Sequence, residues 1–330
     1  MNRFDLAVSI HPYIHSPLSK NAIFLNKLLA LSPMALLAFY HYGVMALTAI
    51  LSAAFFVLLP TYMALKLKNR RLADIDNENY YYALLFALTL PAGTPFYVIA
   101  AGGLLLNLLA FTSGGACALR IINPIALVSC FLVMIFNEKI YLFNGPRAFM
   151  SGAWFSPFPS PDYSGGLLYH IHNGEFNTAG QGLKHTIDIL SGWNPGHYGE
   201  LSITLMAGAF IFLYLKKCVD PAPLIGSAAG LCAGVSALYY PQGFNIVLVE
   251  IISHAFASMF LFYSCFVLTD YYSSPQKYSA RLMYGLTFGL LFSLLSCYNG
   301  GPDCSNYSLA MASACVPMID NIYNRGGLRT

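Results

Sequence analysis

Residues 44–65 read VMALTAILSAAFFVLLPTYMAL, a stretch of 22 residues without a charged side chain. As an α-helix this stretch would be about 33 Å long, which is enough to cross the roughly 30 Å hydrocarbon core of a bilayer. Comparable apolar runs recur along the 330-residue chain, which is 57% hydrophobic and 9% charged and has a mean hydropathy of +0.59. A soluble protein carries roughly 25% charged residues, so this chain has too few to cover a water-facing surface. The sequence predicts an all-α polytopic protein embedded in the lipid bilayer, and it excludes a soluble globular enzyme, a disordered chain and a nucleic-acid binder.

The apolar runs between charged or Pro/Gly-rich breaks predict about ten transmembrane helices. The third run is the shortest, because about 13 apolar residues extend only about 20 Å, and it is typical of a half-helix. The ten predicted segments are 23–41, 44–65, 80–92, 95–112, 121–143, 199–215, 222–240, 245–269, 281–298 and 305–319.

The distribution of basic residues predicts the orientation. An even number of spans places both termini on one side of the membrane. If that side is the cytoplasm, 14 of the 17 Lys and Arg residues lie inside or at the inner ends of spans, and only Lys139, Arg147 and Lys184 lie outside. This asymmetry follows the positive-inside rule. We therefore expect a multi-pass protein of the bacterial inner (cytoplasmic) membrane with both termini cytoplasmic.

One long hydrophilic connection divides the predicted spans. It separates a first membrane half, residues 1–143, from a second, residues 199–330, each with about five spans, and it forms a periplasmic loop at 144–198. The pairs Gly114-Gly115 and Gly300-Gly301 each follow the fourth span of their half. This echo favours two inverted five-helix repeats, although two Gly-Gly pairs among 27 glycines also arise by chance.

The third predicted segment ends in a break, Leu90-Pro91-Ala92-Gly93-Thr94-Pro95. Irregular backbone at membrane depth is tolerated only where it is buried in protein or lines a cavity, and interrupted spans point to binding sites in transporter-like folds. The alternative is a tight turn at the outer interface. The residues alone leave both readings open.

Two ionisable side chains in the eighth predicted segment have the spacing of one helix face. Glu250 and His254 are four residues apart, and an ionisable pair at membrane depth points to a function such as a proton relay. Both lie in the outer half of that segment, where the side chains could instead reach the interface. The histidines of the outer connection, including His197, have no partner at a diagnostic metal-ligand spacing, so we expect surface histidines and no metal site.

Short motifs in a fixed order along the chain carry a family resemblance. From about residue 10 to 325 the sequence resembles the family that contains the D subunit of Rnf-type ion-translocating electron-transport complexes (RnfD) and the B subunit of the sodium-pumping NADH:quinone reductase (NqrB). The motifs are Pro12-Tyr13-Ile14-His15-Ser16, Ala87-Leu88-Thr89-Leu90-Pro91, Gly114-Gly115, Ile122-Asn123-Pro124, Gly199-Glu200, Thr269-Asp270, Ser274-Pro275, Gly300-Gly301-Pro302-Asp303 and Val316-Pro317-Met318-Ile319-Asp320.

The resemblance implies a flavin in the outer loop. In the family a threonine there carries FMN through a phosphoester bond, and the matching stretch here is Ser164-Gly165-Gly166-Leu167. Leucine has no hydroxyl group, so no phosphoester can form at Leu167, and noncovalent FMN or riboflavin remain as alternatives. The other cofactor-binding positions that the resemblance implies are Gly114, Gly115, Asn123, Thr269 and Asp270.

The function implied by the resemblance is that of an integral membrane subunit of a flavin-dependent, Na⁺- or H⁺-translocating electron-transport oxidoreductase. Its partners would be the other subunits of an Rnf/Nqr-type complex and the lipid bilayer, with no nucleic acid. The alternative is a redox-inactive relative that acts as a structural subunit or as a small-solute transporter or channel, since the family fold resembles that of urea-transporter-like proteins. Analogy of fold is weak support for transport.

Overall fold

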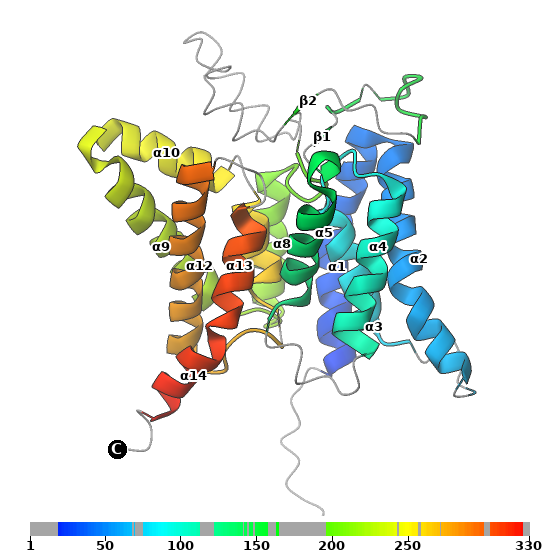
Figure 1. Ribbon diagram of the computed structural model, residues 1–330. Coiled ribbons are helices and arrows are strands. Elements are labelled where there is room, and N and C mark those ends of the chain that lie inside the picture. Colours follow the sequence, from blue (N-terminus) through cyan, green and yellow to red (C-terminus); the bar gives the residue numbers. More distant parts are fainter. Residues whose placement is uncertain are drawn as a thin grey trace, which may run out of the picture.

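The computed structural model is an upright assembly of helices (Figure 1). The described chain starts and ends at the same face of this assembly, where α1 begins and α14 ends, and the short pair β1–β2 lies at the opposite face. The structure describes residues 19–67, 69, 75–112, 122–140, 142–143, 145–147, 149–157, 163–164, 196–242, 244–256, 259–270, 272–299 and 304–325.

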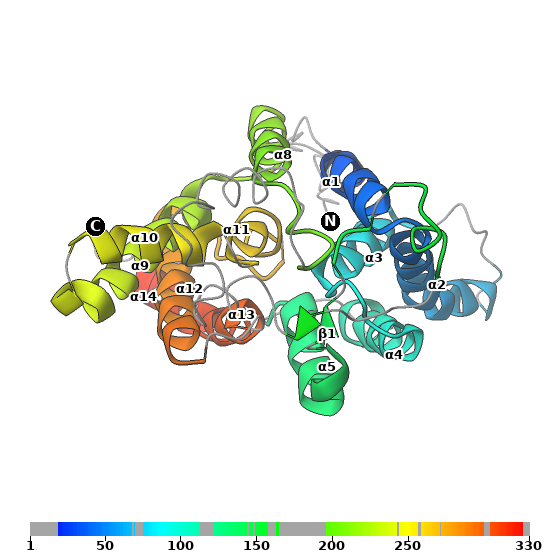
Figure 2. The same cartoon turned by 90° about the horizontal axis from the view of Figure 1, so that it is seen from above.

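Seen along the helices, the elements form two groups (Figure 2). The N-terminal helices are α1 (Lys20–Tyr42), α2 (Val44–Leu67), α3 (Asn77–Thr89), α4 (Phe96–Asn107) with its π-helical extension η2 (Leu108–Thr112), and α5 (Pro124–Ile140). The C-terminal helices are α8 (Ile203–Leu215), α9 (Ala222–Tyr239) with the 3₁₀ turn η3 (Tyr240–Gln242), α10 (Phe244–Phe256), α11 (Phe260–Phe262), the π-helix η4 (Tyr263–Val267), α12 (Tyr278–Asn299), α13 (Cys304–Ala314) and α14 (Val316–Arg325). Helix α8 packs against α1 and so joins the two groups.

Each predicted segment contains a helix, but the helices differ in their ability to cross a bilayer. In the described part of the chain α1, α2, α9 and α12 are long and apolar enough. A fifth crossing results if α10 and the helical stretch through Val267, inclined at 63° to each other, count as one broken span. The protein is therefore a multi-pass helical membrane protein, while ten complete crossings and an internal repeat remain predictions. Helix α3 has 13 residues, as expected for a half-helix.

The closest helix pair is α9 with α12, which pack through small residues. A Cβ atom on Gly226 of α9 would lie 2.2 Å from the Leu282 carbonyl oxygen, and one on Gly285 of α12 would lie 2.1 Å from the Pro223 carbonyl oxygen. The two backbones are thus in direct contact. Lipid removes the hydrophobic driving force between helices, and close van der Waals packing of this kind holds them together instead.

At the face opposite the chain ends, residues 149–157, which follow α5, cover the tight turn between α1 and α2 (Figure 1). The Trp154 indole Nε1 donates to the Tyr40 carbonyl at 3.1 Å, and the Val44 amide donates to the Trp154 carbonyl at 3.0 Å. Gly43 in this turn has a φ of +64°, which favours glycine. Arg147, which the sequence places on the outer side, is buried here and donates to the Ala153 and Ser156 carbonyls.

The same face carries the only regular strand pairing among the described residues. Strands β1 (Leu142–Phe143) and β2 (Tyr163–Ser164) are antiparallel, with Ser164 opposite Leu142. The position of β2 places the start of the predicted flavin-bearing stretch at the face opposite the chain ends (Figure 1).

Candidate functional site

A buried carboxylate lies where the two groups of helices meet. Asp270 follows η4 and is 1% exposed. Its Oδ1 accepts a hydrogen bond from the Tyr82 hydroxyl of α3 at 2.5 Å. Its Oδ2 accepts from the Ser273 hydroxyl at 3.2 Å and from the Ser273 amide at 3.4 Å. A buried charge is tolerated only when it is hydrogen-bonded in this way, and the bond from Tyr82 connects the N-terminal helices directly to the segment after η4.

Asn123 joins the same network from the start of α5. Its Oδ1 accepts from the Ile125 amide at 3.0 Å, which is the hydrogen bond of a helix N-cap. Its Nδ2 donates to the Val267 carbonyl at 3.0 Å and to the Ser273 hydroxyl at 3.1 Å. One side chain therefore caps α5 and binds the end of η4.

A buried lysine completes the junction from α1. Lys27 is 2% exposed, and its Nζ donates to the Thr269 carbonyl at 3.1 Å. The ammonium group also lies 5.9 Å from the ring centroid of Phe24 and 5.4 Å from that of Tyr81, within the range of cation–π attraction.

The end of η4 explains why polar side chains gather there. A helix leaves its last carbonyl groups without amide partners from the next turn, and in a membrane other donors must supply them. The Phe266 carbonyl accepts from the Tyr81 hydroxyl at 3.2 Å. The Val267 carbonyl accepts from Asn123, and the Thr269 carbonyl accepts from Lys27. All three donors come from α1, α3 and the cap of α5. We call this set of contacts between the N-terminal helices and residues 266–273 the polar junction.

An ion pair extends the polar junction toward the face where the chain ends lie. Lys20 Nζ lies 2.5 Å from Glu78 Oε2, and the Tyr272 hydroxyl donates to the same Glu78 oxygen at 3.2 Å. Glu78 is 3% exposed. These contacts again join α1 and α3 to the segment that follows η4.

The break between α3 and α4 is buried in protein. Leu90 and Ala92 are 3% and 0% exposed. Residues 196–199 run antiparallel to the break, with hydrogen bonds from the Tyr198 amide to the Leu90 carbonyl at 3.2 Å and from the Ala92 amide to the Gly196 carbonyl at 3.1 Å. Neighbouring backbone thus supplies hydrogen bonds that the end of α3 lacks. The depth of this break in the membrane, and with it the alternative of a turn at the outer interface, stays a prediction.

The expectation of a surface histidine is wrong for His197, which lies beside this break. His197 is 3% exposed, and its Nδ1 is 3.0 Å from Glu200 Oε2. The reason is the backbone bridge between Pro91 and His197, which holds this part of the connection inside the helix assembly. In the described part of the chain no three His, Cys, Asp or Glu residues are grouped as metal ligands.

Glu250 and His254 share a helix face in α10 as predicted, and His254 lies inside the protein. It is 0% exposed, its Nδ1 is 2.8 Å from the Glu250 carbonyl oxygen and 3.5 Å from Glu250 Oε2, and its Nε2 is 3.7 Å from Cys297 Sγ of α12. The imidazole therefore packs between α10 and α12, and no described contact tests a proton-relay role.

The structure brings three of the predicted cofactor-binding residues together. Asn123, Thr269 and Asp270 all belong to the polar junction, whereas Ser164 lies in β2 at the opposite face. Gly114, Gly115, Gly165, Gly166 and Leu167 lie outside the described residues. The sequence reading missed Lys27 and Tyr82. A lysine within an apolar run is itself a signal, because ionisable residues at membrane depth are expensive.

An apolar cavity beside the outer end of α2 does not suit a flavin phosphate. It has a volume of about 820 Å³ between α2, the start of α4 and Tyr198. Thr48, Ser52, Thr94 and Tyr198 carry the hydroxyl groups of its wall, and the first three donate to a carbonyl of their own segment. Among the described residues no lysine or arginine lines the cavity, so those residues offer no cationic partner for a phosphate group.

These features define a multi-pass helical membrane protein with two buried polar sites, one at the connection between α3 and α4 and one at the end of η4. The sequence model of the NQR2, RnfD, RnfE family matches residues 7–327, and the chain belongs to this family.

Similar proteins agree with this assignment at low identity. The D subunit of the proton-translocating ferredoxin:NAD(+) oxidoreductase complex of Clostridium ljungdahlii is 24% identical over 317 residues, covering 95% of this chain and 93% of the relative. The D subunit of the Na(+)-translocating ferredoxin:NAD(+) oxidoreductase complex of Acetobacterium woodii is 24% identical, covering 97% and 94%. The D subunit of the ion-translocating oxidoreductase complex of Erwinia tasmaniensis is 24% identical, covering 95% of each chain.

Proposed function

We propose that this chain is the D-type membrane subunit of an ion-translocating electron-transport oxidoreductase complex that couples electron flow to Na⁺ or H⁺ movement. The observation that carries the proposal is the match of the family along almost the whole chain, residues 7–327. Relatives with nearly complete mutual coverage are named as the D subunit of such complexes. Its partners are then the other subunits of an Rnf/Nqr-type complex.

The proposed architecture has about ten spans in two halves, residues 1–143 and 199–330, with residues 144–198 in the periplasm. The distribution of Lys and Arg supports this orientation. The common face of the two described chain ends supports it as well (Figure 1). The protein would lie in a bacterial inner membrane with both termini in the cytoplasm.

We expect that no FMN is attached to residue 167 through a phosphoester bond. Leu167 has no hydroxyl oxygen to form that bond. A flavin, if the complex holds one in this subunit, would be noncovalent FMN or riboflavin. Such a group would supply the redox chemistry, while the protein supplies position and electrostatics.

A two-part experiment tests the role in the complex. The chain is tagged at its C-terminus and purified from native membranes, and inverted vesicles from the wild type and from a deletion strain are assayed for Na⁺ or H⁺ uptake driven by reduced ferredoxin and NAD⁺. We expect the other complex subunits to co-purify and ion uptake to be lost on deletion. Purification of the chain alone, together with unchanged ion uptake, would contradict the proposal.

In-gel fluorescence tests the cofactor. Under ultraviolet light a denaturing gel should show no flavin band at the mass of this subunit, whereas Leu167→Thr made in the presence of the flavin-transferring enzyme should show one. A fluorescent wild-type band would mean that another residue carries FMN. The redox-inactive alternative is a structural subunit or small-solute transporter, and the missing hydroxyl at Leu167 points that way. This alternative is favoured if no flavin is released on denaturation and vesicles lacking the chain keep electron transfer.

A further inference from the structure

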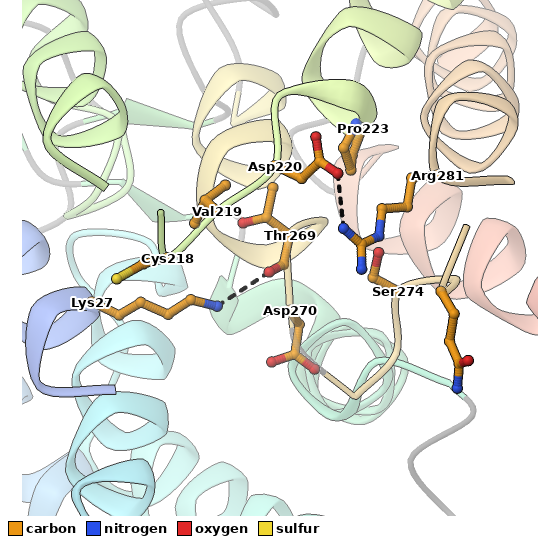
Figure 3. A pocket seen from close by; sticks show the side chains of 10 residues that line it. Lys27, Cys218, Val219, Asp220, Pro223, Thr269, Asp270, Ser274 and Arg281 are labelled. Atoms are coloured by element: carbon orange, nitrogen blue, oxygen red, sulfur yellow. Dashed lines mark hydrogen bonds and ion pairs between the residues drawn. The ribbon is translucent and has the colours of Figure 1, made fainter. Parts of the chain in front are cut away.

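A partly open cavity of about 270 Å³ lies beside the polar junction. One water molecule occupies roughly 30 Å³ in the liquid, so the cavity has room for a small polyatomic group. Figure 3 shows Lys27 entering it from one side and Arg281 from the other, with Thr269 between them. The cavity is lined by Lys27, Cys218, Val219, Asp220, Pro223, Thr269, Asp270, Ser274, Gln276 and Arg281.

The two cationic side chains have hydrogen-bonding capacity that the protein does not use. An ammonium group has three N–H donors, yet the Thr269 carbonyl is the one hydrogen-bond acceptor for Lys27 among the described residues. Arg281 donates through Nε to the Pro275 carbonyl and through Nη1 to Asp220 Oδ2, both at 2.8 Å. Its Nη2 has no acceptor in the part of the chain that the structure describes.

The two carboxylates of the wall, in contrast, are already engaged. Both oxygens of Asp270 accept from Tyr82 and Ser273. Asp220 accepts from the Ala222 amide at 3.2 Å through Oδ1 and from Arg281 through Oδ2. The wall therefore has unused donors on two cations, and its acidic acceptors are occupied by protein donors. Such a wall complements a ligand that is negatively charged and rich in acceptors.

The position of the cavity adds to this preference. Helix α9 begins at Ala222, next to the lining residue Pro223, and the positive end of a helix dipole favours anions. The lysine belongs to α1 and the arginine to α12. A ligand between them would connect the N-terminal to the C-terminal helices at the face that carries the chain ends.

We propose that this cavity is a binding site for an oxyanion of the phosphate class, held between the Lys27 ammonium and the Arg281 guanidinium. The phosphate group has two sources, inorganic phosphate in solution and the headgroup of a phospholipid in the adjacent leaflet. The Thr269 carbonyl fixes the ammonium group, and Asp220 fixes the guanidinium, so both donors are oriented before the ligand binds.

The test uses the full-length chain in nanodiscs and measures the thermal unfolding midpoint. One arm titrates inorganic phosphate in phosphatidylcholine discs, with chloride at equal ionic strength as reference. The second arm titrates the fraction of phosphatidylglycerol in phosphatidylcholine discs without added phosphate. The variants are Lys27→Met and Arg281→Met, and Lys277→Met at the same face is the matched control because Lys277 is exposed.

We expect a saturable rise of the midpoint in one arm, with at least tenfold weaker apparent affinity in both cavity variants and wild-type behaviour in Lys277→Met. A response to inorganic phosphate identifies a soluble oxyanion, and a response only to phosphatidylglycerol identifies a lipid headgroup. No response in either arm, or an equal response in Lys27→Met and the wild type, would overturn the site and leave a cavity that holds water. If Lys27→Met does not fold, Arg281→Met gives the same decision, since this side chain is partly exposed.

Discussion

Two connections between helices satisfy their backbone hydrogen bonds by different means. We name them the outer and the inner break after the proposed orientation. The outer break, residues 90–95 between α3 and α4, is completed by backbone hydrogen bonds from residues 196–199. The inner break, the described residues 268–270 and 272–275 after η4, is completed at the polar junction by side chains from the N-terminal helices. The hydrogen bonds that complete the outer break join backbone groups, with the His197–Glu200 pair beside them, while those of the inner break involve a lysine and an aspartate side chain.

This difference assigns different roles to the two breaks. The backbone hydrogen bonds of the outer break hold residues 90–92 against residues 196–199. Ionisable residues at membrane depth are costly and are by default functional candidates. The inner break is therefore where we expect function to depend on single side chains.

The largest expected effect is at Asp270. Asp270→Ala removes the acceptor of Tyr82 and Ser273 and the nearby negative charge for the buried Lys27. Loss of one partner from a buried polar network of this kind costs about 3 kcal/mol or more. We expect the thermal midpoint in detergent to fall strongly for Asp270→Ala and less for Asp270→Asn, which keeps an acceptor for Tyr82. Equal midpoints for wild type and Asp270→Ala would show that the inner break does not depend on this carboxylate.

The outer break should be sensitive to a side chain that pushes its closely packed backbones apart. A Cβ atom on Gly199 would lie 2.7 Å from the Phe262 ring and 2.9 Å from the Leu88 carbonyl oxygen. Gly199→Ala should therefore cost about 2 kcal/mol through overpacking, measured as a lower thermal midpoint.

Gly208→Ala in α8 is the matched control for this substitution. Nothing lies within 4 Å of the Cβ position at Gly208, and alanine is the better helix former. We expect an unchanged or slightly higher midpoint. A similar loss of stability in both variants would mean that close packing at Gly199 is not the cause.

Asn123 allows the two roles of one side chain at the inner break to be separated. Asn123→Ser keeps a hydroxyl oxygen for the Ile125 amide and removes the amide donor to the Val267 carbonyl and Ser273. Asn123→Ala removes both. Because a lost N-cap costs about 1 kcal/mol, we expect Asn123→Ala to lie about 1 kcal/mol below Asn123→Ser in unfolding free energy. Identical losses in the two variants would show that the cap contributes nothing.

The sequence predicts the helices better than it predicts the junction. The expected spans 23–41 and 44–65 correspond to Lys20–Tyr42 and Val44–Leu67, because apolar runs report directly on contact with lipid or core. Ser19 is a recognisable N-cap, and its hydroxyl accepts from the Ala22 amide at 3.2 Å. These are local properties that neighbouring residues determine.

The polar junction depends on contacts between distant parts of the chain. The family resemblance identifies Asn123 and Asp270 individually, but it gives no reason for both to bind Ser273. The positive-inside count places Lys27 among the cytoplasmic basic residues, and this count says nothing about its burial. It is buried because the chain after η4 places the Thr269 carbonyl against α1, a consequence of tertiary packing. His197 is likewise buried through tertiary packing, because its backbone pairs with that of Pro91.

The smallest expected effect concerns a side chain at the outer break. Thr94 is 7% exposed, and its hydroxyl donates to the Pro91 carbonyl at 2.8 Å. The Thr94 amide also donates to this carbonyl at 3.2 Å, so Thr94→Val leaves the carbonyl with a partner and costs about 1 kcal/mol or less. At the inner break the corresponding loss, Asp270→Ala, leaves Tyr82 and Ser273 without their shared acceptor. A midpoint for Thr94→Val as low as that of Asp270→Ala would mean that the outer break also depends on side chains, and the distinction between the two breaks would then fail.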